Sequence, residues 1–526
     1  MSDHDDAVHD EATPSGDGGG GDGADAERLT SAFSRRLHAK RSASRSRGAN
    51  GAGEQHHHHA LDHLLSAVTL SFHDVSFGVK VGPPWRRSYK PILRGVSGRA
   101  QPGRLLAIMG ASGAGKTSLL NLLAGRASGV GTGSVRINGD RFSTSQLRAL
   151  SGYVMQDDLL SAELTVRESL MFVARLRLPS SVTRAERAEL VDAVLEELGI
   201  GHIAGTKVGD STGQQSKKRG VSGGERKRLA IGAELITDPA ILFLDEPTSG
   251  LDSTTALAVV QTLRMLARSG RTVIATIHQP RSGIFELFDD LLLLADGRVA
   301  YAGPCDRAVA YFAKLGHECP QYTNPADYFL DITSVDRRGA EVERTSTARR
   351  DAIVAAYDES AAATTARTLP TINADAATVD AAAAAAHKAR ASWLRQFIAL
   401  SLRFLLNTYR DKARTIFRLV QTIFISFIIA LLFFQLGNDQ TSIQDKSGVL
   451  FFILLNNSFS GMFSLLNSFS SERPIFLRET AQGYYGTSSY FVAKALVELP
   501  LSLIPIIFGV IVYYIVGLSP GLDRFA

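Results

Sequence analysis

A glycine-rich stretch at residues 110–117 has the residue types and spacing of a phosphate-binding loop. Its sequence, GASGAGKT, fits G-x-x-x-x-G-K-[ST], follows the apolar run RLLAIM and precedes the helical pattern SLLNLLAG. Glycines let backbone N–H groups surround phosphate oxygens, and a helix N-terminus adds a positive dipole end. Lys116 is expected to reach the β- and γ-phosphates, and Thr117 to ligate Mg²⁺. The candidate nucleotide contacts are Gly110, Ala111, Ser112, Gly113, Ala114, Gly115, Lys116 and Thr117.

Two adjacent carboxylates, Asp245 and Glu246, form the second candidate site. They follow the four apolar residues ILFL, which predict a buried strand. Ligands bind at the C-terminal ends of strands in α/β sheets. We therefore expect Asp245 to hold the Mg²⁺ shell and Glu246 to polarise the attacking water. The alternative is a carboxylate pair on a surface turn, and the apolar run before it favours the catalytic interpretation.

A third motif, VSGGERKR at residues 221–228, taken alone predicts only a flexible turn before a helix. In the company of the other motifs, the chain resembles the ATP-binding cassette (ABC) family. VSGGE resembles that family's signature loop, and YVMQDD resembles its Q-loop, with Gln156 as the glutamine. SGLD at residues 249–252 resembles its D-loop, and His278 in ATIHQP resembles its switch histidine. The motifs occur in the family's order with ordinary spacing.

Other segments resemble the white-type (G) subfamily of half transporters, in which the nucleotide domain precedes the membrane domain. They are HQPRSGIFELFDDLLLLADGRVAYAGP, NPADYFLDI and ERPIFLRETAQGYYGTSSYFVAKALVELP. The resemblance covers roughly residues 68–526 without the linker described below. It implies a dimer, homo- or heteromeric, that couples ATP hydrolysis to movement of a small hydrophobic or lipid-like substrate. The cofactors that it implies are ATP and Mg²⁺.

The resemblance also assigns roles to individual residues. ATP would lie between the P-loop of one protomer and the signature loop of the other, formed by Ser222, Gly223 and Gly224. Glu246 would be the catalytic base, and His278 would contact the γ-phosphate and orient the attacking water.

Two further assignments concern residues outside those loops. The resemblance implies that Gln156 senses both Mg²⁺ and the membrane domain. An aromatic residue near the first strand usually stacks on adenine in this family, and Phe77 is the candidate. An ordinary core residue of the strand is an equally good interpretation of Phe77.

The residues around these motifs predict an α/β P-loop nucleotide-binding domain over residues 67–335. VTLSFHDVSF alternates apolar and polar residues as a half-buried strand does, and RLLAIMG, ILFLDEP and RTVIATIHQP are short apolar runs. Helical patterns at 185–198 and 253–268 alternate with these runs, which is typical of a buried parallel sheet.

The segments on either side of this domain have a different composition. Residues 1–66 combine low hydrophobicity with high charge, which predicts a disordered tail. Residues 336–390 are predicted to be an Ala-rich linker, either a solvated helix or disordered, because no apolar stripe is recognisable.

An all-α membrane domain is predicted for residues 391–526. Apolar stretches at about 416–436, 448–468 and 499–518 each approach the roughly 20 residues that span a bilayer. The excess of Lys and Arg before the first span and between the second and third places the nucleotide domain in the cytoplasm. The short segment Glu472–Glu479 is the candidate coupling helix, with a plain interfacial helix as the alternative.

The resemblance implies six spans per chain, whereas only three are predicted here. Either the chain is a piece of a longer transporter, which we favour, or it is a short form that hydrolyses ATP without transporting. The second possibility leads to an alternative function, a membrane-bound ABC ATPase that acts as a regulator. No address for an endomembrane is recognisable, so the plasma membrane and an endomembrane both stay open.

Composition supports this classification. The 526 residues contain 57 Lys and Arg against 52 Asp and Glu, a formal net charge of +5. This excess is small for the length, and we expect no nucleic acid partner beyond the ATP cofactor itself. Two cysteines exclude a small secreted scaffold held by disulfides.

Overall fold

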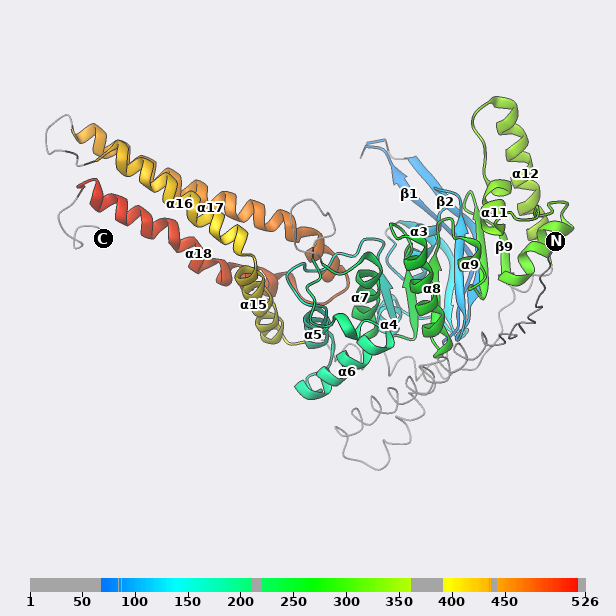
Figure 1. The fold of residues 1–526 in the computed structure, drawn as a ribbon. Helices are drawn as coiled ribbons and strands as arrows, with labels where there is room; N and C mark the ends of the chain where they lie inside the picture. Colours follow the sequence, from blue (N-terminus) through cyan, green and yellow to red (C-terminus); the bar gives the residue numbers. More distant parts are fainter. Residues whose placement is uncertain are drawn as a thin grey trace, which may run out of the picture.

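The computed structural model describes residues 68–518, except 84, 87, 128, 210–219, 361–390, 435 and 437–441. The predicted tail at 1–66, the second part of the predicted linker and the last eight residues therefore lie outside the described part. Figure 1 shows an α/β unit, from which a bundle of long helices extends to one side.

A six-stranded sheet forms the centre of the α/β unit, in the order β5-β6-β7-β3-β8-β9. Neighbouring strands are parallel, except that β9 is antiparallel to β8. The central strands are buried along their whole length because helices cover both faces, which explains their unbroken apolar runs. The strands are β3 (Leu105–Gly110), β5 (Ser151–Val154), β6 (Ile241–Leu244), β7 (Thr272–Thr276), β8 (Asp290–Ala295) and β9 (Arg298–Pro304).

A second sheet, with the order β2-β1-β4, is antiparallel throughout. It consists of β1 (Leu70–Val81), β2 (Ser88–Ala100) and β4 (Val130–Ile137). This sheet and the helices α3 (Lys116–Leu123) and α4 (Thr144–Leu150) share one hydrophobic core with one face of the larger sheet.

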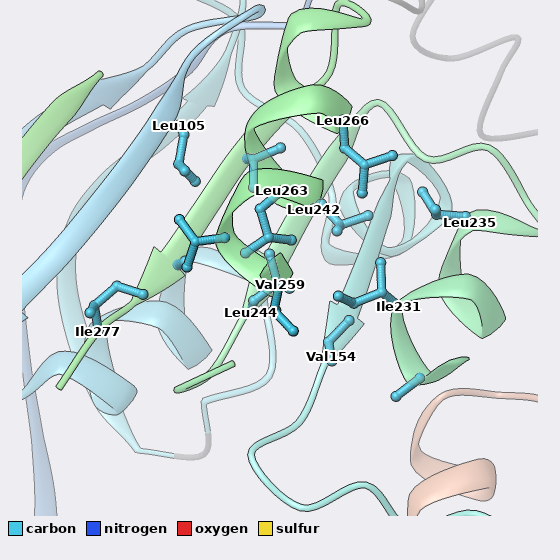
Figure 2. Close-up of a cluster of buried hydrophobic side chains, with 14 of the residues drawn as sticks. Leu105, Val154, Ile231, Leu235, Leu242, Leu244, Val259, Leu263, Leu266 and Ile277 are labelled. Carbon is cyan, nitrogen blue, oxygen red and sulfur yellow. The ribbon is translucent and has the colours of Figure 1, made fainter. Parts of the chain in front are cut away.

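The other face of the larger sheet is covered by a group of longer helices. They are α5 (Val166–Arg177), α6 (Arg184–Glu197), α7 (Gly223–Leu235) and α8 (Ser253–Arg268). Figure 2 shows leucines of the strands against the apolar stripe of α8, which repeats at Val259, Leu263 and Leu266. The helical patterns predicted at 185–198 and 253–268 correspond to α6 and α8. Because β3 and β6 are both parallel to β7, their C-terminal ends lie at the same edge of the sheet.

The first part of the predicted linker forms a helix, one of the two alternatives, but this helix has an apolar face that the sequence analysis did not expect. Helix α12 (Ala340–Asp358) follows the short helices α9 (Ser282–Phe285), α10 (Ala308–Lys314) and α11 (Pro325–Thr333), and it packs on β9 and α11. Its buried side chains Ile353, Val354 and Tyr357 form a short apolar face at helical spacing. An ion pair between Arg298 and Asp351 holds the same helix to the sheet. Three buried apolar residues thus dock a helix whose other residues are mostly exposed.

The helical unit consists of α15 (Trp393–Arg410), α16 (Lys412–Leu432), α17 (Ser442–Ala481) and α18 (Thr487–Ile515). Within the described residues, two helices are long and apolar enough to cross a membrane, at Thr415–Leu432 and Thr487–Ile515. They correspond to the first and third predicted spans. The second predicted span, 448–468, lies in α17, where part of the side chains is outside the described set, and it stays a prediction. Apolar side chains of α16, α17 and α18 meet in a small cluster that includes Ile429, Val449 and Val512.

Two features of α17 differ from the expectation or refine it. The segment Glu472–Glu479 is not a separate short helix but the continuation of α17, with Pro474 inside it. Asn457, which the sequence places in a predicted span, lies against Gly509 of α18, where an added Cβ would be 3.2 Å from Asn457 Nδ2. The amide therefore occupies a close helix–helix approach.

Candidate functional site

The glycine-rich loop connects the end of β3 to the start of α3. Gly110, Gly113 and Gly115 have φ angles of 153°, 80° and 98°, which other residues adopt only at a cost. At Gly110 an added Cβ would also lie 2.5 Å from the carbonyl oxygen of Leu294. Lys116 Nζ donates to the carbonyl oxygens of Gly110 at 2.9 Å and Ala111 at 3.2 Å. The loop thus has the curled backbone and the central ammonium that a phosphate group requires.

Polar oxygens converge beside this loop at the end of β6. Thr117 Oγ1 donates to Asp245 Oδ1 at 3.0 Å, and Thr276 Oγ1 donates to the same oxygen at 2.7 Å. Asp245 is only 6% exposed. A hydroxyl and a carboxylate at hydrogen-bond distance are the oxygen ligands that Mg²⁺ prefers. The residues present therefore fit a magnesium ion at Thr117 and Asp245.

Glu246 stands next to this pair and contacts the Q-loop. Gln156 Nε2 donates to Glu246 Oε2 at 3.1 Å, and the backbone N–H of Glu246 donates to Thr276 Oγ1 at 2.8 Å. Glu246 has a φ of 43°, an uncommon left-handed conformation that turns the chain sharply after the buried strand. Burial lowers the pKa of Lys116, while the carboxylates of Glu246 and Asp245 raise it. Both carboxylates therefore lie close enough to Lys116 for their charges to affect its pKa.

The exposed residues of the signature loop and the switch histidine make no contact with this cluster in the described part of the chain. Ser222 caps the N-terminus of α7, and both Ser222 and Gly223 are exposed. Gly224 is buried, and an added Cβ there would lie 2.0 Å from Thr255 Cγ2. His278 is exposed two residues after β7, and the described contacts include none between it and Glu246. Within the described residues, contacts thus join the P-loop, Asp245, Glu246 and Gln156, whereas none joins Ser222, Gly223 or His278 to them.

The burial of Phe77, the candidate adenine contact, favours its alternative role as a core residue of the strand. Phe77 is 6% exposed, and its ring lies against Gly129, where an added Cβ would be 2.5 Å from Phe77 Cε2. It belongs to the core between the smaller sheet and α3. Phe77 is therefore packed as a core residue of the strand, and its contact with adenine stays a prediction.

Two residues that the sequence analysis did not select hold the Q-loop in place. Lys227, although it follows an exposed loop, is buried, donates to the carbonyl oxygen of Gln156 at 2.8 Å and pairs with Asp158 at 2.8 Å. Tyr153 lies three residues before Gln156 and is buried beside Asp245, whose charge and hydrogen bond help burial to raise the Tyr153 pKa. In the sequence, the only indication of a role for Lys227 and Tyr153 was that each lies inside a recognisable motif.

The junction with the helical unit contains paired charges. Arg410 of α15 reaches Glu168 of α5, and Gln482 Nε2 donates to the carbonyl oxygen of Tyr153 at 3.1 Å. Tyr484 donates to Glu234 Oε1 at 3.0 Å. The residues after α17 therefore contact β5 and α7, which border the nucleotide-binding loops.

Comparisons with known proteins agree with this arrangement. The family model of ABC transporters matches residues 93–249, and two models of ABC-2 type transporters match residues 395–526 and 278–349. The broad substrate specificity ATP-binding cassette transporter ABCG2 of Sus scrofa is 40% identical over 488 residues, which cover 87% of this chain and 72% of that protein. Protein white of Drosophila melanogaster is 40% identical over 445 residues, which cover 83% of this chain and 63% of that protein.

Two further matches come from a plant and from a solved structure. ABC transporter G family member 14 of Arabidopsis thaliana is 38% identical over 480 residues, which cover 88% of this chain and 72% of that protein. A solved dimeric ATP-binding cassette in a post-hydrolysis state aligns with 45% of this chain and 98% of its own, at 24% identity and a TM-score of 0.37.

The fold and the site thus define a P-loop ATPase joined to a helical membrane domain. The chain belongs to the G subfamily of the ABC transporters and has the half-transporter order of domains. It is a membrane protein that hydrolyses ATP to drive transport. The family and the fold class predicted from the sequence are confirmed.

Proposed function

We propose that this chain works as a dimer, with a second copy or with another half transporter, and binds two ATP molecules between the two nucleotide domains. The observation that carries this proposal is the separation within one chain. The P-loop, Asp245, Glu246 and Gln156 are gathered at one edge of the sheet, whereas Ser222 and Gly223 are exposed elsewhere. Their exposed helix N-terminus is available to the phosphates of a nucleotide held by the partner.

Each residue at this edge of the sheet has a separate role in ATP hydrolysis. The P-loop N–H groups and Lys116 bind the β- and γ-phosphates, and Thr117, Asp245 and Gln156 would hold Mg²⁺. When bound, the ion neutralises charge that develops on the phosphate oxygens. Glu246 accepts a proton from the attacking water, and Gln156 fixes the orientation of that carboxylate. His278 contacts the γ-phosphate once the dimer has closed.

Hydrolysis is coupled to the membrane helices through the junction. The buried Arg403–Glu479 pair joins α15 to the end of α17, and Gln482 contacts the strand that leads to Gln156. A change in the Q-loop therefore displaces the ends of helices that continue into the membrane. This requires the nucleotide domain and residues 472–486 to lie on the same, cytoplasmic side, with several spans in the membrane.

The substrate that we propose is a small hydrophobic or lipid-like molecule. Large apolar side chains are exposed along α16, α17 and α18, among them Phe424, Phe451 and Ile507. These surfaces suit acyl chains or an apolar substrate better than a polar one. The relative from Sus scrofa is named for broad substrate specificity, which agrees with a site selected by hydrophobicity rather than by precise polar contacts.

One experiment separates this function from the alternative of a membrane-bound regulator. Vesicles that contain the protein are supplied with ATP and with labelled hydrophobic substrates, and phosphate release and substrate movement are measured together. We expect both to occur in the wild type, and both to be lost in Glu246→Gln. ATP hydrolysis without movement of any substrate in the panel would contradict the transporter and support the regulator.

A further inference from the structure

A cavity of about 370 Å³ lies between the nucleotide-binding edge and the end of α17. Its lining includes Asp245 on one side and Ala481, the last residue of α17, on another. The remaining polar groups of its wall come from the region after the P-loop and from β5: Asn121, Arg126, Arg148 and Tyr153. Of these four, only Tyr153 lies in one of the motifs, as the first residue of YVMQDD.

Arg126 carries a charge that nothing in the described structure pairs. Its side chain is half-buried, and its guanidinium lies over the ring of Tyr153, 4.3 Å from the ring centre. Within the described residues the guanidinium has no hydrogen bond and no ion pair. Burial lowers the pKa of Arg126, and although the carboxylate of Glu234 raises it, that carboxylate already binds Arg177 and Tyr484.

A second guanidinium borders the same cavity. Arg148 is exposed, and its one hydrogen bond in the described structure goes to the carbonyl oxygen of Gly125 at 2.9 Å. The positive charge of Arg148 further lowers the pKa of Arg126, so the two like charges are close enough to repel each other. Such repulsion is relieved when an anion sits between the two charges.

Another group in the cavity wall also suits an anion. The amide of Asn121 can donate hydrogen bonds, whereas the hydroxyl of Tyr153 is already engaged by Asp245. Asp245 is the single carboxylate of the wall, and it faces Thr117 and Thr276. Two guanidiniums and an amide around one space are groups that proteins use to bind a tetrahedral oxyanion.

We propose that the cavity between Arg126 and Arg148 is a second binding site for a phosphate group, next to the nucleotide site, with which it shares only Asp245. An anion there would lie between the carboxylate Asp245 and the end of α17, next to Gln482, which donates to the backbone of Tyr153. The phosphate group can come from inorganic phosphate, which hydrolysis releases in this same unit, or from the headgroup of an anionic lipid.

Equilibrium dialysis with radiolabelled inorganic phosphate tests the site in the full-length protein. Saturating AMP-PNP and Mg²⁺ fill the nucleotide site, so that any phosphate bound lies elsewhere. We expect phosphate to bind at millimolar concentration or below, and the double variant Arg126→Gln/Arg148→Gln to weaken this binding at least ten-fold. Binding of AMP-PNP by that variant shows that the domain remains folded.

Two further variants make the result specific. Arg148→Gln alone changes an exposed side chain, and it should weaken phosphate binding even if the variant at the half-buried Arg126 does not fold. Arg141→Gln removes an exposed arginine outside the cavity and should have no effect. Absence of phosphate binding up to 10 mM, or equal binding in wild type and Arg148→Gln, would overturn the proposal.

A second arm identifies the source of the phosphate group. A soluble, short-chain phosphatidylinositol phosphate is added as a competitor to the labelled phosphate. Displacement at concentrations at least ten-fold below those of unlabelled phosphate supports a lipid headgroup as the occupant of the same site. Displacement that needs equal or higher concentrations supports inorganic phosphate.

Discussion

Arg410 of α15 and Glu168 of α5 form a two-point ion pair across the junction between the helical unit and the nucleotide domain. Nη1 of Arg410 lies 2.6 Å from Oε2 of Glu168, and Nη2 lies 2.8 Å from Oε1. Arg410 Nη1 also donates to the carbonyl oxygen of Glu163 at 3.0 Å. A guanidinium that holds a carboxylate at two points fixes orientation as well as distance. The pair therefore fixes the orientation of α15 relative to α5.

We predict that Arg410→Met reduces transport per ATP hydrolysed about five-fold or more while basal ATP hydrolysis changes less than two-fold. Methionine keeps part of the side-chain volume but not the two-point contact. Arg167→Met is a matched control, because Arg167 also pairs with a carboxylate at two points, through Nε and Nη2 to Asp192, on the exposed surface of the nucleotide domain. Substrate movement and phosphate release are measured in the same vesicles. An equal loss of coupling in both variants would assign the effect to general surface charge.

The same pair predicts how the junction responds to acid. The hydrogen bond from Arg410 is the main cause that lowers the Glu168 pKa from 4.5 to about 2. A carboxyl group with a lowered pKa contributes stability that is complete above its unfolded value and is lost as pH falls through its folded value. We therefore expect this contribution to be constant from pH 8 to about 5, and to be lost between about 4.5 and 2.

Melting temperature against pH checks this expectation. Wild type and Glu168→Gln should differ by a constant amount at neutral pH, and their curves should converge below pH 4. Asp192→Asn, in the exposed pair of the nucleotide domain, serves as the control. A difference that grows as pH falls would contradict the assigned direction of the pKa shift.

Glu246→Gln is predicted to lower ATP turnover by a factor of about 10² to 10⁴, the usual range for loss of a general base. The amide keeps the shape of the side chain and can still contact Gln156, which lies 3.1 Å away. Binding of a fluorescent ATP analogue should stay within about two-fold of wild type. Glu286→Gln, at an exposed carboxylate outside the site, should leave turnover unchanged. Normal turnover in Glu246→Gln would remove Glu246 from the role of base.

The motifs of the nucleotide site were readable in the sequence because each one depends on local chemistry. Glycines with positive φ, a lysine at the helix start and two carboxylates after a buried strand occupy fixed positions along the chain. Phe77 was ambiguous for the opposite reason. Its role depends on whether its ring is covered, and Gly129, 52 residues later, covers it.

Contacts between segments far apart in the chain could not be predicted from the sequence either. Lys227 looks like one of several surface cations in VSGGERKR, yet it is buried and holds the Q-loop by its backbone. Arg403 and Glu479 are 76 positions apart, and nothing in their neighbours indicates that they pair. The apolar face of α12 was not predicted because its three buried apolar residues stand among polar residues and alanines. Such features arise from tertiary packing, which periodicity does not encode.

The Arg403–Glu479 pair is predicted to be a structural requirement of the junction. Both side chains are buried, and Arg403 Nη1 lies 2.8 Å and 2.7 Å from the two carboxylate oxygens of Glu479. Although burial alone would lower the pKa of Arg403, the Glu479 carboxylate raises it. Glu479→Gln leaves a buried guanidinium uncompensated, so we expect it to destabilise the protein by about 3–5 kcal/mol.

The double variant Arg403→Met/Glu479→Met tests whether charge imbalance causes this loss. Replacing both charges with apolar side chains removes the desolvation cost of each, and most of the lost stability should return. Melting temperature in detergent and protease resistance between α15 and α17 are the measurements. A double variant less stable than Glu479→Gln would show that the ion pair itself stabilises the junction.

Gly224 provides the sharpest steric prediction. A Cβ at this position would lie 2.0 Å from Thr255 Cγ2 of α8, too close for α7 to keep its place. Gly224→Ala should therefore displace the signature loop and lower ATP turnover at least ten-fold. Thr255→Ser removes the clashing methyl group, so Gly224→Ala/Thr255→Ser should recover most of the activity. Gly283→Ala, at a helical glycine where nothing lies within 4 Å, is the control and should be neutral. A Gly224→Ala defect that Thr255→Ser does not relieve would place the added methyl group against the nucleotide of the partner instead.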